Sequence, residues 1–340
     1  MRPKELQEFL KNVAIPNRWP VLVTSSPGCG KTDIITEATK ACGFNLIVSH
    51  PVVSDPTDFK GMPFINTDGE AEFIPFNDLK QLVQANKPTV FFLDDLGQAP
   101  SSVQAAAMQL LLARQINGHK ISDEVTFLAA TNRRQDKAGV SGILEPVKSR
   151  FRTIIDLKPD EDDWCEWALS HNMPLELIAF IRWTANKKDP ILYSFNPSLD
   201  IQNNSPCPRT FAFVGDMMKA KMNQSYFVEV VKGAIGEAAT TTLMGFIRIC
   251  SELPNPLDLI ADPEKCKLPA SNRPDILYAL TSAIAGKANK KNFGNIIRLS
   301  ERLPKEFGLM LIQDCIIMDE LLADIEAFQK WSEKNVDLIP

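Results

Sequence analysis

A phosphate-binding loop is the feature that most constrains this chain. A short apolar, β-branched run begins at Val21, and a glycine-containing segment follows it directly. Glycines let backbone N–H groups converge on an anion, and the N-terminus of a following helix adds partial positive charge. The nucleotide-binding residues that this pattern predicts are Ser26, Pro27, Gly28, Cys29, Gly30, Lys31, Thr32 and Asp33.

Two side chains of this loop have separate predicted roles. Lys31 would bind the β- and γ-phosphates of a nucleotide, and the Thr32 hydroxyl would bind Mg²⁺. The common pattern G-x-x-x-x-G-K-S/T has a first glycine where this chain has Ser25. The alternative is a glycine-rich turn with a chance Lys-Thr pair, and the order strand, loop, helix favours the nucleotide site.

The next elements predict a parallel sheet. The helix that starts at Lys31 is expected to stop near Gly43, a residue typical of helix C-termini, and residues 45–49 form a second buried strand. A strand, a helix and a strand of these lengths are typical of a βαβ unit in an α/β domain.

Two adjacent carboxylates follow a fully apolar strand at residues 88–93. Ligands of parallel sheets bind at the carboxyl ends of the strands, which is where Asp94 and Asp95 would lie. Asp94 is the predicted Mg²⁺-side carboxylate, and Asp95 is predicted to polarise the attacking water. Paired acids after a strand are otherwise often a solvated loop.

Another buried strand, residues 124–132, ends in a polar pair at the same edge. Asn132 is predicted to orient the lytic water between Asp95 and the γ-phosphate. The alternative is that Asn132 only forms a turn.

Arg150 is a candidate arginine finger. A predicted helix ends at Arg150, and a strand at residues 153–156 follows. A guanidinium at the domain surface would reach the γ-phosphate held by a neighbouring subunit and stabilise transition-state charge. This role requires an oligomer, and the alternative is a local salt bridge of Arg150 or Arg152.

A hairpin insertion is predicted between residues 59 and 76. Two β-rich runs flank Asp68-Gly69, a pair typical of hairpin turns, while Pro63 and Pro75 indicate an edge-like or irregular hairpin. The sequence leaves two interpretations open: a surface hairpin, or a loop that faces a central pore.

These features, in this order, resemble the AAA+ ATPases and, within them, the MoxR-like, dynein-related branch of bacterial and phage type. The resemblance rests on the phosphate loop, the Asp94-Asp95 strand followed by residues 98–100 (Gln-Ala-Pro), the strand end at Asn132, the segment 148–151, the hairpin near 58–63 and a later segment, 205–211. It implies a P-loop NTPase of the AAA+ type: a parallel-sheet domain at 1–157, a helical lid at 158–252 and a helical C-terminal extension at 253–340.

The resemblance also implies an assembly and further roles. It implies a hexameric ring of identical subunits with ATP and Mg²⁺ at the interfaces, and a von Willebrand factor A-type protein as a possible partner. Asn132 becomes the first sensor, Arg150 the finger acting in trans and Arg209 the second sensor on the lid. Asp95 stands where the family usually has Glu, which predicts slower water activation, and an exposed helix-start arginine is the alternative for Arg209.

Helical periodicity dominates the second half. The expected helices are 160–171, 174–187, 208–221, 224–251, 273–286, 293–302 and 305–331. Connections rich in proline are expected at 190–208 and 254–269, and an apolar stripe near residues 299–311 is expected to form core. The basic cluster 287–291 is expected to be a solvated loop rather than a nucleic-acid contact.

Composition favours a protein client over nucleic acid. The net charge is −5, no basic and aromatic residues interleave, and no run approaches the roughly 18 apolar residues of a membrane span. Seven scattered cysteines predict reduced thiols in the cytoplasm. We therefore predict an ATP-hydrolysing remodelling motor or chaperone; the alternatives are a nucleic-acid motor or loader on the same fold and a slow or non-hydrolysing ATP switch.

Overall fold

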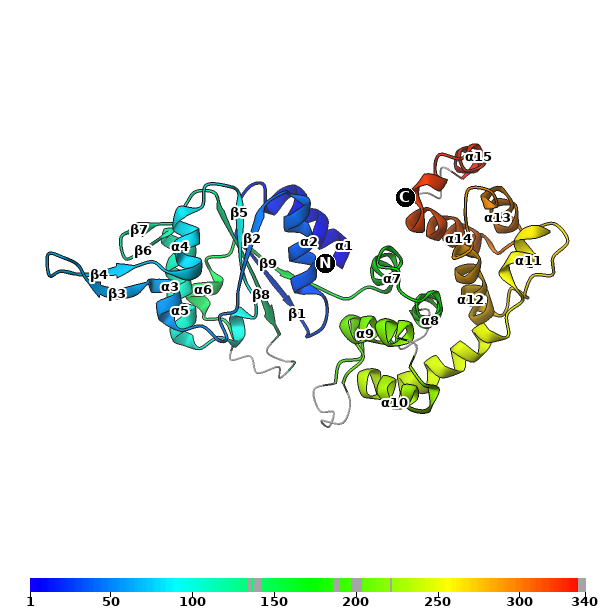
Figure 1. The fold of residues 1–340 in the computed structure, drawn as a ribbon, viewed down its shortest axis with the longest axis horizontal. Coiled ribbons are helices and arrows are strands. Elements are labelled where there is room, and N and C mark those ends of the chain that lie inside the picture. Colours follow the sequence, from blue (N-terminus) through cyan, green and yellow to red (C-terminus); the bar gives the residue numbers. More distant parts are fainter. Residues whose placement is uncertain (134–135, 137–141, 186–189, 197–203, 221, 336–340) are drawn as a thin grey trace. The chain divides into compact units, whose positions relative to one another are not determined.

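The computed structural model describes residues 1–133, 136, 142–185, 190–196, 204–220 and 222–335. The chain forms two compact units (Figure 1): Met1–Pro159 with the short segment Phe195–Pro197, and Asp160–Ser194 with Ser198–Pro340. The predicted division of the second half into a lid and an extension stays a proposal.

A five-stranded parallel sheet forms the centre of the first unit. Its strands lie in the order β2-β5-β8-β1-β9, so β1, which precedes the phosphate loop, lies between β8 and β9. The strands are β1 Val21–Ser25, β2 Asn45–Ser49, β5 Thr89–Leu93, β8 Val125–Asn132 and β9 Thr153–Asp156. The predicted α/β parallel-sheet fold is confirmed.

Helices cover both faces of this sheet (Figure 1). One face carries α1, a π-helical segment and α2, and the other carries α3 to α6, which pack with strand residues such as Phe91 and Phe127 in one core. Because both faces are covered, the central strands β5 and β8 are buried along their whole length and consist mostly of apolar residues. The bounds are α1 Pro3–Phe9, π-helix Leu10–Ala14, α2 Lys31–Ala41, α3 Pro56–Lys60, α4 Asn77–Gln84, α5 Ser101–Ala113 and α6 Glu145–Lys148.

The predicted hairpin is present as β3 (Met62–Ile65) and β4 (Ala71–Ile74), an antiparallel pair separate from the main sheet. The side chain of Asn66 accepts hydrogen bonds from two N–H groups of the turn, which fixes its shape. A second, short hairpin, β6 (Gln115–Ile116) and β7 (His119–Lys120), was not predicted. It braces the first hairpin, because a ring nitrogen of His119 lies 2.6 Å from the carbonyl oxygen of Phe73.

The described part of the second unit is helical. Its helices are α7 Glu161–Ser170, α8 Leu175–Ala185, α9 Pro208–Lys219, α10 Gln224–Ser251, α11 Pro256–Ala261, α12 Pro274–Ala285, α13 Phe293–Ser300, α14 Lys305–Met318, a 3₁₀ turn Glu320–Leu322 and α15 Glu326–Lys334. Leu299, Leu303, Phe307 and Leu311 are buried in one cluster, as predicted for the apolar stripe. Among the described helices, none has both the length and the apolar character that a membrane crossing needs.

Three sequence expectations for this unit are wrong in detail. The single helix expected at 305–331 ends at Met318, because the backbone of Asp319 leaves the helical region and its carboxylate caps the next turn. Helix α10 is broken at Gly236, where φ is 76°. The connection expected at 254–269 contains α11, which Asn255 caps.

Candidate active site

The loop between β1 and α2 has the backbone that anion binding requires. Gly28 and Gly30 have φ values of 76° and 84°, in the left-handed region that favours glycine, and Gly30 immediately precedes the first turn of α2. The side chains of Ser26 and Cys29 are buried, whereas Asp33 is exposed in the first turn of the helix. The loop therefore ends at a helix N-terminus, the place where backbone N–H groups bind phosphate.

Lys31 is buried, at 7% exposure, and its ammonium group donates hydrogen bonds to oxygens at the ends of strands β1 and β8. Nζ donates to Asn132 Oδ1 at 2.7 Å, to Ser25 Oγ at 2.9 Å and to the carbonyl oxygen of Ser26 at 3.3 Å. The parallel register of β1 and β8 places Ser25 opposite Asn132 and so brings these partners together.

Ser25 has a contact that the sequence interpretation missed. The pattern identified it only as a departure from glycine, but its hydroxyl accepts the Lys31 hydrogen bond. Ser25 is also not among the residues with positive φ, so a side chain is accommodated there without backbone strain. No sequence signal for this contact exists apart from the hydroxyl itself at the end of the strand.

Asn132 also contacts Asp95. Its amide nitrogen Nδ2 donates to Asp95 Oδ1 at 3.2 Å, so one amide joins the lysine to the carboxylate. Asp95 has a φ of 56° and opens a 3₁₀ turn, Leu96–Gln98, at the end of β5. Left-handed backbone is best tolerated, after glycine, by Asn and Asp, which gives a physical reason for an aspartate at this position.

Thr32 and Asp94 form the second pair of the site. Thr32 Oγ1 donates to Asp94 Oδ2 at 2.8 Å, and the Asp94 side chain is largely buried. Hydroxyl and carboxylate oxygens are hard ligands of the kind Mg²⁺ takes when substrate phosphates complete its shell, so this pair fits the predicted ion. Within the described residues, no cluster of three or more His, Cys, Asp and Glu side chains offers a different metal site.

Arg150 follows α6, which ends at Lys148 and not at the arginine as expected. Its Nε is buried without a hydrogen-bond partner, and no ion pair of Arg150 occurs in the described part of the chain. Arg152, the other candidate for a local contact, lies over the ring of Trp19 at 4.6 Å. Within the described residues neither arginine forms the alternative salt bridge, and the trans role of Arg150 stays a prediction.

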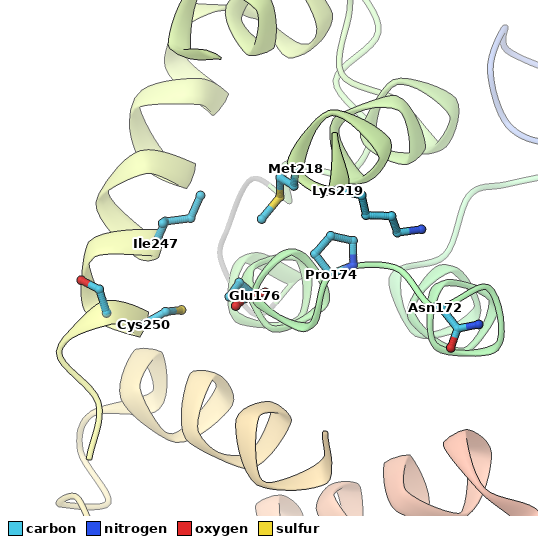
Figure 2. A pocket seen from close by; sticks show the side chains of 8 residues that line it. Asn172, Pro174, Glu176, Met218, Lys219, Ile247 and Cys250 are labelled. Atoms are coloured by element: carbon cyan, nitrogen blue, oxygen red, sulfur yellow. The ribbon is translucent and has the colours of Figure 1, made fainter. Parts of the chain in front are cut away.

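Arg209 belongs to the second unit, where it is exposed in the first turn of α9. Its predicted sensor role stays a prediction. The second unit also has an open hollow of about 510 Å³ (Figure 2), bordered by side chains of its helices that include Glu176, Lys219 and Cys250. None of the residues that line it belongs to the predicted site.

Comparison with known proteins finds a family model that matches the part of the chain that holds the site. Residues 21–159, from β1 through β9, match the model of the ATPase family associated with various cellular activities (AAA). The match is to this broad family, so the MoxR-like assignment stays a prediction.

Two curated proteins are similar over about half of the chain. Peroxisomal ATPase PEX1 of Saccharomyces cerevisiae is 26% identical over 200 residues, which cover 52% of this chain and 18% of the yeast protein. Peroxisomal ATPase PEX1 of Komagataella phaffii is 27% identical over 168 residues, 47% of this chain and 14% of that protein. The chain thus matches less than a fifth of the length of these relatives.

Among solved structures, the RuvB Holliday junction branch migration motor of Thermotoga maritima is similar at 16% identity. The similarity covers 80% of this chain and 79% of that one, with a TM-score of 0.40. A score this low supports no conclusion about function.

Proposed function

We propose, from the premise that residues 21–159 are an AAA ATPase domain, that this protein binds Mg·ATP at the carboxyl edge of its sheet and hydrolyses it to remodel a protein client. One observation carries the proposal. Lys31, Asn132 and Asp95 form a continuous hydrogen-bonded series beside the Thr32–Asp94 pair, and these five residues come from the ends of two strands, β5 and β8, and the start of helix α2.

Each side chain has a proposed part in turnover. Lys31 binds β- and γ-phosphate oxygens, Asp95 accepts the proton of the attacking water, and Asn132 holds that water in place. Thr32 and Asp94 would hold Mg²⁺, which supplies positive charge to the phosphates when bound. The Asp95 carboxylate, the Asn132 amide and the Lys31 ammonium are already fixed in place before substrate binds. This lowers the free-energy cost of reorganising the site during the reaction.

The proposed assembly is a homo-oligomeric ring, with a hexamer as the specific proposal. Arg150 would complete the site of the adjacent subunit, and Arg209 would contact the nucleotide from the lid. The ring and the von Willebrand factor A-type partner are supported by the family resemblance alone.

The hairpin β3–β4 supports a polypeptide as the client. Phe64 and Ile65 are 56% and 68% exposed, and Met62, Phe73 and Ile74 are exposed beside them. We propose that this hairpin faces the central pore, where apolar side chains would hold an unfolded segment while ATP turnover moves it.

Calorimetry with Mg·ATP tests nucleotide binding. Lys31→Ala should abolish measurable binding and lower turnover at least about 100-fold, because the loop loses its phosphate-binding cation. Lys40→Ala is the matched control: Lys40 is exposed in the last turn of the same helix. Folded wild-type protein that takes up no adenine nucleotide, or a Lys31→Ala variant that binds normally, would contradict the proposal.

The class of client is tested by stimulation of ATP turnover. A permanently unfolded polypeptide should raise turnover, and Phe64→Ser should abolish the increase while basal turnover stays unchanged. Val53→Ser is the control, since Val53 is an exposed apolar residue outside the hairpin. Stimulation by DNA or RNA with steep salt dependence would instead favour a nucleic-acid motor.

A further inference from the structure

Gln104 is a buried polar residue that none of the roles above uses. It lies in α5 on a face with buried Val103, Ala106 and Ala107, and its own exposure is 0%. Its Nε2 donates to the carbonyl oxygens of Ala99 and Gly142 at 3.1 and 3.0 Å, and its Oε1 accepts from the N–H of Leu144 at 3.0 Å. Both donor hydrogens and the acceptor oxygen are therefore engaged with backbone groups.

These backbone groups belong to two different parts of the site. Ala99 ends the 3₁₀ turn that Asp95 opens, and its N–H donates to Leu96 within that turn. Leu144 begins α6, because its carbonyl oxygen accepts the first N–H groups of that helix. One amide thus joins the turn after β5 to the segment that leads to Arg150.

The same two segments also meet at Gly97. A Cβ atom on Gly97 would lie 2.2 Å from Thr131 Oγ1 and 3.2 Å from Ile143 Cγ1. The turn after Asp95 is therefore packed tightly between the residue before Asn132 and the segment bonded to Gln104. A shift of one segment would be transmitted to the others, because such packing leaves no space to absorb it.

Arg150 depends on this arrangement for its position. It has no ion pair within the described residues, and its backbone N–H donates to Val147 in α6. Helix α6 has only four residues, too few to be stable without tertiary contacts. The contacts that hold it include the Gln104 bonds and the packing of Ile143, Leu144, Val147 and Phe151 in the core of the first unit.

We propose that Gln104 is a positioning residue that fixes α6, and through it Arg150, for action in the active site of an adjacent subunit. The proposal rests on the proposed trans role of Arg150. It makes Gln104 a link between the turn at a subunit's own Asp95 and the arginine that the same subunit offers to its neighbour.

Gln104→Met is the test variant, because methionine has a similar volume but forms none of the three hydrogen bonds. We expect kcat to fall about tenfold with the KM for ATP within about twofold of wild type, since misplacing a catalytic group affects the transition state more than ground-state binding. Gln109→Met, the same change at an exposed position of α5, should behave as wild type.

Mixed rings separate a positioning role from a general structural defect. Lys31→Ala subunits have inactive sites of their own but offer an intact Arg150, so mixing them with Gln104→Met subunits should raise turnover per Gln104→Met subunit. Mixing Lys31→Ala with Arg150→Ala subunits tests the trans role separately. If that second pair recovers activity and the Gln104→Met pair does not, or if Gln104→Met alone retains full turnover, the inference about Gln104 is wrong while the trans role stands.

Two results would instead overturn the trans role itself: full turnover of Arg150→Ala alone, or no recovery when it is mixed with Lys31→Ala. Should Gln104→Met fail to fold by circular dichroism, Leu144→Pro takes its place. The φ of −58° at Leu144 suits proline, and the change removes the N–H that donates to Gln104. It should show the same recovery with Lys31→Ala, and its absence would contradict the proposal.

Discussion

Each unit of this protein buries a cation, and the two cations differ in their partners. Lys31 of the first unit donates to neutral oxygens of a serine, a backbone carbonyl and an asparagine. Arg182 of the second unit forms two hydrogen bonds, of 2.5 and 2.7 Å, with the carboxylate of Asp314. Neutral oxygens hold a cation less strongly than a carboxylate does, so phosphate can replace them.

The ion pair in the second unit has a structural role: it joins two helices. Arg182 lies in α8 and Asp314 in α14, and both side chains are almost fully buried. Burial alone would lower the pKa of Arg182, but the charge and hydrogen bonds of Asp314 raise it above the ordinary value. The difference teaches that a buried charge indicates a ligand site only where its partners can be exchanged.

The largest effect is expected from breaking the Arg182–Asp314 pair. Asp314→Leu leaves a buried guanidinium without its carboxylate, and we expect the free energy of unfolding to fall by about 3–5 kcal/mol. Urea unfolding followed by tryptophan fluorescence measures it, since four of the five tryptophans, Trp164, Trp167, Trp183 and Trp331, lie in this unit.

The double variant Arg182→Met, Asp314→Leu provides the control. Replacing both partners by apolar residues of similar size should recover most of the lost stability. A single variant as stable as wild type would show that the second cation, like the first, is held by exchangeable partners, and the comparison would fail.

The next effect is expected at Asp95. Asp95→Asn keeps a residue that tolerates the left-handed backbone but removes the proton acceptor, so turnover should fall about 100-fold, or about 2.7 kcal/mol, with ATP affinity within about threefold of wild type. Steady-state turnover and calorimetry measure the two quantities. Asp95→Glu, which keeps a carboxylate, should retain more turnover than Asp95→Asn.

Equal turnover of wild type and Asp95→Asn, from a baseline near zero, would favour a non-hydrolysing ATP switch. The first unit would then be a binding site without chemistry. Phosphate would still replace the oxygens that hold Lys31, whereas the Arg182–Asp314 pair would stay closed.

The smallest effect, at pH values up to about 10, concerns the thiol beside the ion pair. Burial raises the pKa of Cys165 from 9.0 to about 12, and the nearby Arg182 guanidinium opposes that shift. Between about pH 9 and pH 12, the Cys165 thiol therefore stays protonated in the folded state but has lost its proton in the unfolded state. Stability from this thiol is complete below pH 9 and is lost as the pH rises from 9 to 12, at about 1.4 kcal/mol per pH unit.

Urea unfolding at several pH values between 8 and about 11 measures this slope. Cys165→Ala removes the titrating thiol, so the slope of the free energy of unfolding against pH should become shallower by the contribution of about one proton. An unchanged slope in that variant would mean that Cys165 titrates alike in the folded and unfolded states.

The elements that the sequence predicted correctly are those whose signals lie within a few residues. The apolar runs before Gly28 and Asp94 predicted buried parallel strands, and Asp68-Gly69 predicted a hairpin turn. The helix expected at 305–331 failed because Asp319, a residue unremarkable in sequence, leaves the helical backbone and caps the turn after it.

The hydrogen bonds of Gln104 could not be predicted from local sequence patterns. A lone glutamine between buried Val103 and Ala106 is a weak signal, and its partners Gly142 and Leu144 lie about forty residues away along the chain. Hydrogen bonds of this separation follow from how the turn after β5 and the segment before α6 pack, which no local pattern specifies.

The sequence by itself determined which polar residues meet at the sheet edge, because strand, glycine loop and helix start are contiguous and parallel strands bring their polar ends to one side. Tertiary structure decided which residues pair. Ser25 and Asn132 accept hydrogen bonds from Lys31, and Gln104 bonds two separate segments. Arg182 pairs with Asp314, which lies 132 positions further along the chain. Side-chain type is a local property of the chain, whereas the partner of a buried charge depends on which distant segments fold against it.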